Sequence, residues 1–333
     1  MVVAAARRIA RKAIDHARYR GFRALSAISS GPLRGHRALQ TSELIWRDEA
    51  LFVAAFEQGE VFSDYGVILR DRILVENLSP MMGGGMIERH EALNKLELGK
   101  LTRLSGRVAV ISSHAHQRYF HWMMDVLPRI EILRRSGVQF DRIIANTSLA
   151  YQSETLAGLG IVDVISPVAN QRLRADRLLV PSLPGPLGVP SQFSIQFLRH
   201  AFGTSSVPHR KLYLSRGDAV TRRVANESEL LADLPDFEVV LLDGMTVAQQ
   251  AQLFAEALVV IGPHGAGFTN AIFMEPGTDL IEFMPDTYFN DCFEVIAEHL
   301  ELNYHRVGCR SLGGPTHDIV IDRAILQELL ATR

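Results

Sequence analysis

Short apolar runs alternate along the chain with stretches whose apolar positions recur every three or four residues. Runs of Val, Ile and Leu that stop after a few residues are typical of buried β-strands. A helix-like stretch such as 148–159, with Ser148 as its N-cap and Gly160 as its stop, separates two of them. This β-α-β order predicts a parallel sheet covered by helices. The predicted strands are 67–70, 72–75, 108–111, 141–145, 162–165, 177–180, 211–216, 237–242, 259–261, 279–283 and 303–307.

One stretch, 181–190, breaks this alternation with four prolines and two glycines. Such a composition favours a linker between domains. A helix over 191–202 and a second α/β series follow it, with capping signatures at Asn226 and Thr246. The pattern therefore predicts two Rossmann-like domains that face each other across a cleft, over 38–190 and 191–333, after a basic segment over 1–37.

The central motif of the second half is a buried strand, a glycine-rich turn and a helix start over 259–274. Gly262, Gly265 and Gly267 let backbone N–H groups approach a ligand, and a helix N-terminus attracts anions. The turn is therefore a candidate seat for a phosphate or diphosphate. The spacing differs from G-x-G-x-x-G, which disfavours a dinucleotide-binding dehydrogenase. Glycines needed only for packing are the alternative explanation.

Cationic residues follow the first strand of the same half. Arg216 can clamp a diphosphate with its guanidinium, Ser215 can donate another hydrogen bond, and Arg222 or Arg223 can assist. The chain has no Asp-x-Asp pair that would hold a metal–diphosphate, so no metal cofactor is expected. Glu282 ends a strand where a carboxylate can hold a ribose hydroxyl, although a surface acid is the alternative.

The first half offers a polar stripe just after the strand 108–111. On a helix, Arg118, His121, Asp125 and Arg129 would share one face, and Pro128 would kink or restart that helix. A histidine and a carboxylate one turn apart can orient each other or share a proton. His121 and Asp125 are therefore candidates for a general base, with a routine surface ion pair as the alternative.

Composition places the chain among ordinary globular proteins, with 333 residues, 47% of them hydrophobic, and a formal charge of −2. No apolar stretch is long enough to span a bilayer, and arginines interrupt the region where a secretory signal would stand. Cys292 and Cys309 match no metal-binding or redox spacing. A cytoplasmic protein is the expectation.

Positive charge gathers at the start, where residues 1–37 hold nine Lys or Arg and one acid, Asp15. A basic amphipathic stretch can bind an anionic membrane surface, and a solvated or disordered tail is the alternative. Peripheral association with the inner face of the plasma membrane is thus a further expectation. Nothing in the sequence indicates a nucleic-acid partner.

Several ordered motifs resemble those of glycosyltransferase family 61. Residues 119–129 are similar to its YFHWLLDxLPR segment, 213–216 and 222–227 to YxSR and RRxxNE, and 262–270 to GPHGAxLTN. Phe268 replaces the leucine usual in the last motif. The resemblance covers about 108–307 and continues through Glu275–Thr278 and Ile281–Phe283.

This resemblance implies a GT-B fold and inverting, metal-independent sugar transfer from a nucleotide sugar, as in bacterial capsule or exopolysaccharide biosynthesis. It implies that the first domain binds a glycan or lipid-linked glycan acceptor, with His121 or Asp125 as the base. The second domain would bind the nucleotide-sugar donor. Asn226 and Glu227 belong to the motif, but their pattern reads mainly as a helix cap. The expected donor-binding residues are Ser215, Arg216, Arg222, Arg223, Gly262, His264, Gly265, Ala266, Gly267, Asn270 and Glu282.

Two other functions stay open on the sequence. A polysaccharide pyruvyl transferase-like enzyme could share the architecture but would need a phosphoenolpyruvate site. A non-catalytic scaffold of a polysaccharide assembly complex would have no use for His121, Asp125 and Arg216. Neither the donor sugar, the acceptor, the linkage nor the oligomeric state follows from the sequence.

Overall fold

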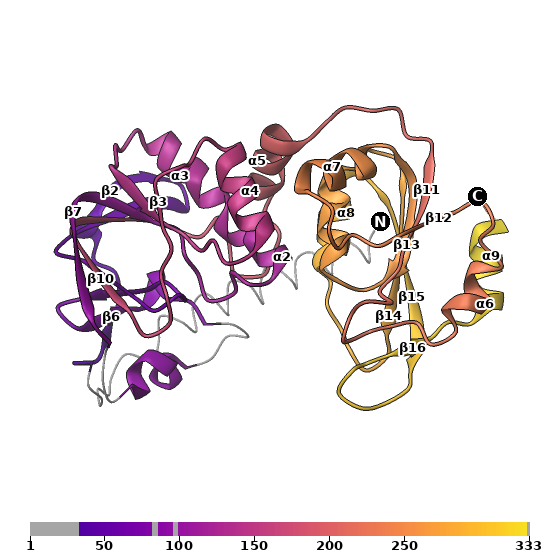
Figure 1. Ribbon diagram of the computed structural model, residues 1–333, viewed down its shortest axis with the longest axis horizontal. Helices are drawn as coiled ribbons and strands as arrows, with labels where there is room; N and C mark the ends of the chain where they lie inside the picture. Colours follow the sequence, from indigo (N-terminus) through magenta and orange to yellow (C-terminus); the bar gives the residue numbers. More distant parts are fainter. Residues whose placement is uncertain (1–32, 82–85, 96–98, 332–333) are drawn as a thin grey trace. The chain divides into compact units, whose positions relative to one another are not determined.

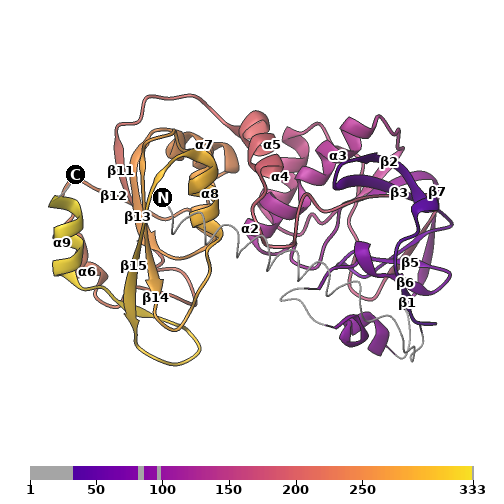
Figure 2. The same ribbon diagram turned by 180° about the vertical axis from the view of Figure 1, so that it is seen from behind.

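The computed structural model describes residues 33–81, 86–95 and 99–331. The chain divides into two compact units, one ending at Ser191 and the other beginning at Gln192, and each is described by itself (Figures 1 and 2). Almost all of the basic segment predicted over 1–37 lies outside the described residues. Both units are α/β, as the alternation of elements predicted. No helix among the described residues is long and apolar enough to cross a membrane.

The first unit is built on a ten-stranded mixed sheet in the order β1-β6-β5-β4-β10-β7-β8-β9, to which β3 and β2 add beside β10. β10, β7, β8 and β9 run parallel, whereas β3 and β4 pair with β10 in the antiparallel direction. The strands are β1 His36–Arg37, β2 Leu44–Asp48, β3 Leu51–Glu57, β4 Glu60–Phe62, β5 Val67–Arg70, β6 Ile73–Val75, β7 Leu101–Val110, β8 Arg142–Ile144, β9 Val164–Ile165 and β10 Arg172–Pro181.

Helices of the first unit follow the parallel strands. They are α2 Tyr119–His121, η5 Trp122–Val126, α3 Pro128–Ser136 and α4 Ala150–Gly158, with short 3₁₀ helices at Thr41–Glu43, Glu76–Leu78, Ile87–Arg89 and Glu91–Asn94. α3 packs on β3 and β10, and the sheet buries residues such as Val108, Ile144 and Leu178. The predicted cap at Ser148 is wrong, because α4 begins one residue later, with Leu149 in the capping position.

The helix expected over 118–129 is interrupted. The stretch Trp122–Val126 is a π-helix, in which the Leu127 N–H donates to the Trp122 carbonyl at 3.0 Å. α3 then restarts at Pro128, as predicted, because a proline lacks the N–H that an interior helical position needs. Single π-turns of this kind occur frequently at functional sites.

The second unit contains a six-stranded sheet in the order β12-β11-β13-β14-β15-β16, parallel except for the last pair. Among its first five strands this is the doubly wound order 2-1-3-4-5. Helices α7 and α8 lie on one face and α6 and α9 on the other (Figures 1 and 2). The strands are β11 Arg210–Leu214, β12 Glu238–Val240, β13 Ala257–Pro263, β14 Asp279–Pro285, β15 Asn303–Ser311 and β16 Ile319–Val320.

The helices of this unit differ from the prediction in two places. Thr246 caps α7 as predicted, but the side chain of Asn226 does not cap α6 and instead bonds the backbone of Ile321. The helix after the glycine-rich turn is a buried 3₁₀ helix, η6. The helices are α5 Gln192–Phe202, α6 Glu227–Leu231, α7 Val247–Ala255, η6 Ala266–Phe273, α8 Cys292–Leu300 and α9 Arg323–Ala331.

Candidate functional site

The carboxyl ends of β11 and β13 mark the point where strand order reverses in the second unit. β11 pairs with β12 on one side and with β13 on the other, all in the parallel direction. Ligands of open α/β sheets bind outside the strands at this switch point. Ser215 and Arg216 follow β11, and His264–Gly267 follow β13, so the fold brings two of the predicted motifs to one edge.

Arg216 lies directly over the glycine-rich turn. A Cβ placed on Gly265 would come within 2.0 Å of Nη1 of Arg216, so any larger residue there would force the guanidinium to move. Nε and Nη2 of Arg216 both donate to the Thr221 carbonyl, at 3.2 and 3.0 Å. Burial, together with the neighbouring Arg222, lowers the pKa of Arg216 to about 10.

Arg222 is held at the same edge in a backbone conformation that few non-glycine residues adopt, with φ at 57°. Its N–H donates to the Thr316 carbonyl at 2.7 Å, and its Nε donates to the His264 carbonyl at 2.9 Å. The guanidinium lies 5.2 Å from the centre of the Tyr288 ring. Among the residues that the structure describes, no ion pair joins Arg216 or Arg222 to a carboxylate.

Ser215 and Arg223 have other partners. The Ser215 hydroxyl donates to Glu227 at 2.9 Å, and the Tyr213 hydroxyl donates to the same oxygen. Arg223 is ion-paired with Asp318 at 3.2 Å and its side chain is half-exposed. Of the two consecutive arginines, only Arg222 therefore lies near Arg216. Donor binding by Ser215 and Arg223 stays a prediction.

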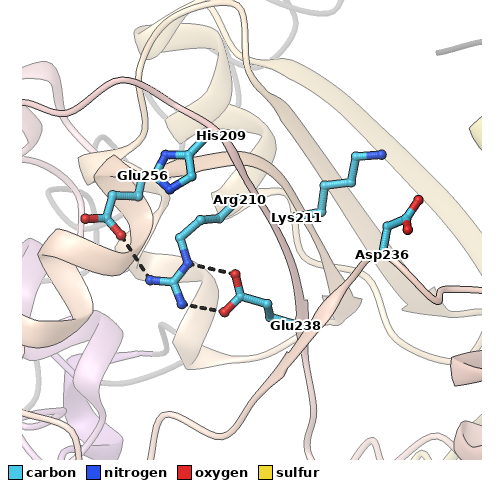
Figure 3. Close-up of a pocket in the computed structure, with 6 residues that line it drawn as sticks. All are labelled: His209, Arg210, Lys211, Asp236, Glu238 and Glu256. Carbon is cyan, nitrogen blue, oxygen red and sulfur yellow. Dashed lines mark hydrogen bonds and ion pairs between the residues drawn. The ribbon is translucent and has the colours of Figure 1, made fainter.

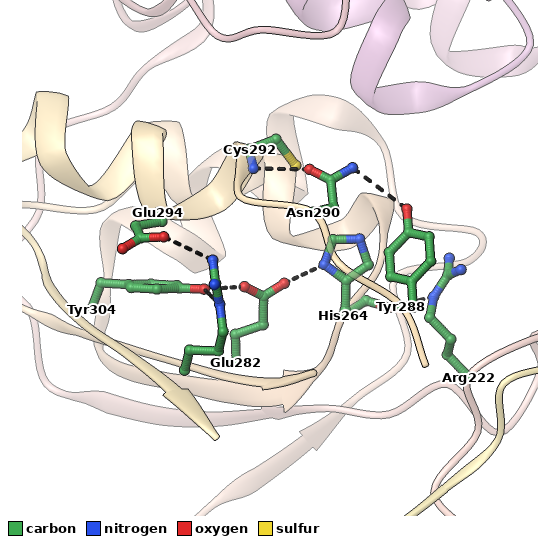
Figure 4. Close-up of polar contacts among 9 residues, drawn as sticks. Arg222, His264, Glu282, Tyr288, Asn290, Cys292, Glu294 and Tyr304 are labelled. Carbon is green, nitrogen blue, oxygen red and sulfur yellow. Dashed lines mark hydrogen bonds and ion pairs between the residues drawn. The ribbon is translucent and has the colours of Figure 1, made fainter. Parts of the chain in front are cut away.

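His264 begins a chain of buried polar contacts (Figure 4). Its Nδ1 bonds Glu282, which is fully buried, and the other oxygen of Glu282 accepts from the Tyr304 hydroxyl. Burial and the Glu282 carboxylate raise the pKa of Tyr304. Both oxygens of Glu282 thus hold protein groups, and this geometry gives the ribose contact no support. The ribose role remains an untested prediction.

The remaining members of the predicted donor set shape the turn. A Cβ on Gly262 would lie 2.6 Å from the Leu214 carbonyl, and one on Gly267 would lie 2.7 Å from a methyl group of Leu242. Asn270 is fully buried and donates to Gln250 at 2.7 Å. Ala266 is the first residue of η6. These residues fix the backbone that follows β13, which is the structural alternative considered from the sequence.

In the first unit, His121 and Asp125 form a hydrogen-bonded pair. Nδ1 of His121 lies 2.6 Å from Oδ2 of Asp125 across the π-turn. Burial raises the pKa of Asp125, and the bond to His121 opposes that rise. The His121 side chain is 12% exposed, and its Nε2 has no hydrogen-bond partner in the described part of the chain. The pair therefore leaves one ring nitrogen for a substrate.

The buried Arg129 connects the ends of two strands of the first unit. Its guanidinium donates to the carbonyls of Ile111 and Pro181, each at 2.8 Å, and so ties together the ends of β7 and β10. Burial lowers the pKa of Arg129 to about 9, and Asp125 opposes the change. Of the polar stripe predicted from the sequence, Asp125 and Arg129 are buried, His121 is half-buried and Arg118 is exposed.

Sequence reasoning missed several residues of these sites. Tyr288 and Tyr304 contact site residues from positions distant in sequence, and no motif identified them. Glu227 was identified only as a motif residue within a helix cap, whereas its carboxylate accepts from Ser215. Gly188 was read only as part of a linker, but its N–H lies 3.2 Å from Asp125. The proline and glycine content of 181–190 was the available signal that this stretch needs an unusual backbone.

An open hollow of about 480 Å³ lies elsewhere on the second unit, at the amino end of β11 (Figure 3). Its central cation, Arg210, is neutralised by Glu238 and Glu256. Because this cation is already paired with two carboxylates, we do not place the site there. No group of three or more His, Cys, Asp or Glu in the described ranges is placed to hold a metal ion.

Comparison with known proteins points to one family. The Glycosyltransferase 61 family model matches residues 119–281, just under half of the chain. A 63-residue stretch, 19% of the chain, is 35% identical to Beta-1,2-xylosyltransferase RCN11 of Oryza sativa subsp. japonica. A 65-residue stretch, 20% of the chain, is 35% identical to Beta-1,2-xylosyltransferase of Arabidopsis thaliana. Each match spans 12% of the relative's own length.

The family match includes the segment with His121 and Asp125, the Ser215–Arg216 and Arg222–Arg223 stretches and the glycine-rich turn. It ends one residue before Glu282. These are the motifs on which the resemblance was predicted, and they lie at the carboxyl edges described above. Residues 119–281 therefore match the Glycosyltransferase 61 family.

Proposed function

We propose that this protein is a glycosyltransferase that moves a sugar from a nucleotide-sugar donor to a glycan acceptor. The observation that supports this most strongly is the pair Arg216 and Arg222 at the switch point, with no carboxylate ion-paired to either in the described residues. Both arginines are half-buried, and the exposed Asp218 opposes only part of the lowering of the Arg216 pKa. A diphosphate would supply the compensating negative charge that this pair of cations favours. The family match and the relatives' names favour sugar transfer over pyruvyl transfer or scaffolding.

The proposed reaction is a single inverting displacement that needs no metal. The acceptor hydroxyl attacks the anomeric carbon, and the bond from that carbon to the diphosphate oxygen breaks as the new bond forms. The diphosphate leaves with the electron pair, and Arg216, Arg222 and the amides of 265–267 stabilise its charge. A GT-B arrangement, in which the first unit presents the acceptor and the second holds the donor, belongs to this proposal.

We assign the base to His121 and the orienting role to Asp125. Asp125 is 1% exposed and its carboxylate accepts from His121 and Gly188, so it has little surface for a substrate. With Nδ1–H donating to Asp125, the lone pair of the neutral imidazole lies on Nε2. The acceptor proton would pass to that nitrogen.

The proposed setting is surface-polysaccharide biosynthesis, in the cytoplasm or at the inner face of the plasma membrane. The basic segment 1–37 supports membrane association, and a lipid-linked glycan would then be an accessible acceptor. Xylose is the first sugar to test, because both relatives are named β-1,2-xylosyltransferases.

Titration calorimetry with UDP, GDP, TDP and CMP tests donor binding. We expect one nucleotide to bind, and Arg216→Ala to weaken its binding by roughly 10- to 100-fold, the usual value of a charge-assisted hydrogen bond. Arg210→Ala is the matched control, since Arg210 lies at the opposite edge of the same sheet and is paired with Glu238 and Glu256. Binding of phosphoenolpyruvate in place of every nucleotide would reject the proposal.

A second experiment separates nucleotide binding from sugar transfer. His121→Gln should keep the nucleotide affinity of the wild type while sugar transfer falls by about 10²-fold or more, as expected when a general base is lost. Transfer or donor hydrolysis is measured with UDP-xylose and the sugar nucleotide whose base binds best. Unchanged transfer in both His121→Gln and Asp125→Asn would show that neither residue is the base.

A further inference from the structure

The segment that joins β10 to α5 contains a tight turn. The Val189 N–H donates to the Pro186 carbonyl at 3.0 Å, which closes a four-residue turn over Pro186–Val189. Gly188, its third residue, has φ at +81°, as glycine has at this position of a type II turn. The turn uses the N–H of Val189 for its own closure, so the N–H of Gly188 remains for another partner.

That partner is Asp125. The Gly188 N–H lies 3.2 Å from Oδ1 and 3.2 Å from Oδ2, so a single donor bridges both oxygens of the carboxylate. Oδ2 is also the atom that bonds Nδ1 of His121. On the other side, a Cβ placed on Gly188 would lie 3.3 Å from Cε1 of His121. Gly188 therefore bonds Asp125 through its N–H, and both its positive φ and the narrow space beside His121 favour glycine at this position.

We propose that Gly188 is a positioning residue for the proposed base His121, and that it acts through Asp125. Its N–H fixes the plane of the carboxylate so that Oδ2 accepts from Nδ1–H of His121. That bond selects the tautomer with the Nε2 lone pair free, which a general base needs. This inference rests on the proposed function for its catalytic meaning, but the hydrogen-bond path itself is independent of any substrate.

The charges around Asp125 agree with this role. Burial raises the pKa of Asp125, while the bond and charge of His121, the Gly188 N–H and the charge of Arg129 oppose that rise. Loss of the Gly188 bond would let the carboxyl pKa rise further. A protonated Asp125 would accept less strongly from Nδ1–H, so the preference of His121 for one tautomer would weaken.

The test is ¹⁵N NMR of the ring nitrogens in the full chain labelled at histidine, with the His121 signals identified by their absence in His121→Gln. In the wild type we expect the tautomer with hydrogen on Nδ1. In Gly188→Ala we expect loss of that predominance, with Nε2–H appearing. Gly185→Ala is the matched control in the same segment, because a Cβ there lies 3.5 Å from the Ser191 Cβ, an ordinary contact.

A second measurement does not need Gly188→Ala to fold. The amide proton of Gly188 should move upfield in Asp125→Asn, because a neutral acceptor binds it more weakly. An unshifted amide, or a folded Gly188→Ala with the wild-type tautomer, would overturn the inference. Neither readout needs a nucleotide, so a failure of donor binding would count against the proposed function and not against this hydrogen-bond path.

Discussion

His90 is a buried residue of the first unit whose ionisation opposes folding. It is 2% exposed, and its Nδ1 accepts from the Ala92 N–H at 3.2 Å at the start of a 3₁₀ helix. Burial, and then the nearby His114, lower its pKa from 6.5 to about 4. In the unfolded chain His90 is therefore protonated below about pH 6.5, whereas in the folded chain it is protonated only below about pH 4.

This difference predicts acid sensitivity that a substitution removes. Stability from His90 is fully present above about pH 6.5 and is lost as the pH falls toward 4, by about 2 kcal/mol between pH 7 and pH 5. His90→Asn, which keeps an acceptor for the Ala92 N–H, should flatten this dependence in urea unfolding at the two pH values. Exposed His209→Asn is the control. An unchanged slope in His90→Asn would contradict the shifted ionisation.

Single residues were predictable from the sequence where spacing alone brings partners together. His121 and Asp125 are four residues apart, and their bond forms even across the π-turn. Arg222 and Arg223 are neighbours that the sequence could not separate, because their difference depends on the positive φ of Arg222 and on Asp318, 95 residues from Arg223. Glu227 likewise bonds Tyr213 and Ser215 only after β11 and α6 have packed.

At the scale of elements, the strand β13, the glycine-rich turn and η6 form one continuous strand–turn–helix motif. Gly265 gives Arg216 its place, so we expect Gly265→Ala to lower nucleotide affinity by displacing the guanidinium. The loss should resemble that of Arg216→Ala, and the double variant should bind no worse than Arg216→Ala alone. Calorimetry on the four proteins of this cycle measures the coupling.

The control for that cycle is Gly308→Ala on β15, where a Cβ meets nothing within 4 Å. Additive losses in the double variant would show that Gly265 acts independently of Arg216. The strand and turn of this motif were predictable from the sequence, but the 3₁₀ type of its helix was not. Because η6 is buried along Phe268–Phe273, its sequence lacks the alternation of polar and apolar faces from which a helix is predicted.

At the scale of the molecule, the two α/β series and the proline-rich break between them followed from the apolar pattern. The mixed sheet of the first unit was not predictable from that pattern. Its strands over 36–75 are only two to seven residues long. Several of its turns use positive φ at residues other than glycine or asparagine, including Glu49, Gln58, Ser63 and Asp71. Such turns lack the usual sequence signals.

If the second unit holds the donor, as proposed, a bound nucleotide should protect the backbone of that unit from hydrogen exchange. In hydrogen exchange, the nucleotide that binds should slow exchange in peptides covering 215–223 and 264–268. The peptides at the amino ends of β11 and β12, around Arg210 and Glu238, serve as the internal control. Protection confined to 119–129 would instead place the donor on the first unit.

The turn at Gly188 also decides where the protein can be dissected. Its segment precedes α5 by only a few residues, yet Pro181 accepts from Arg129, Ser182 donates to Phe52 and Gly188 donates to Asp125. A truncation placed at the proline-rich stretch would strip these bonds from the first unit. Separate production of that unit should therefore run through Ser191, and a shorter version would carry a histidine–aspartate pair without its backbone donor.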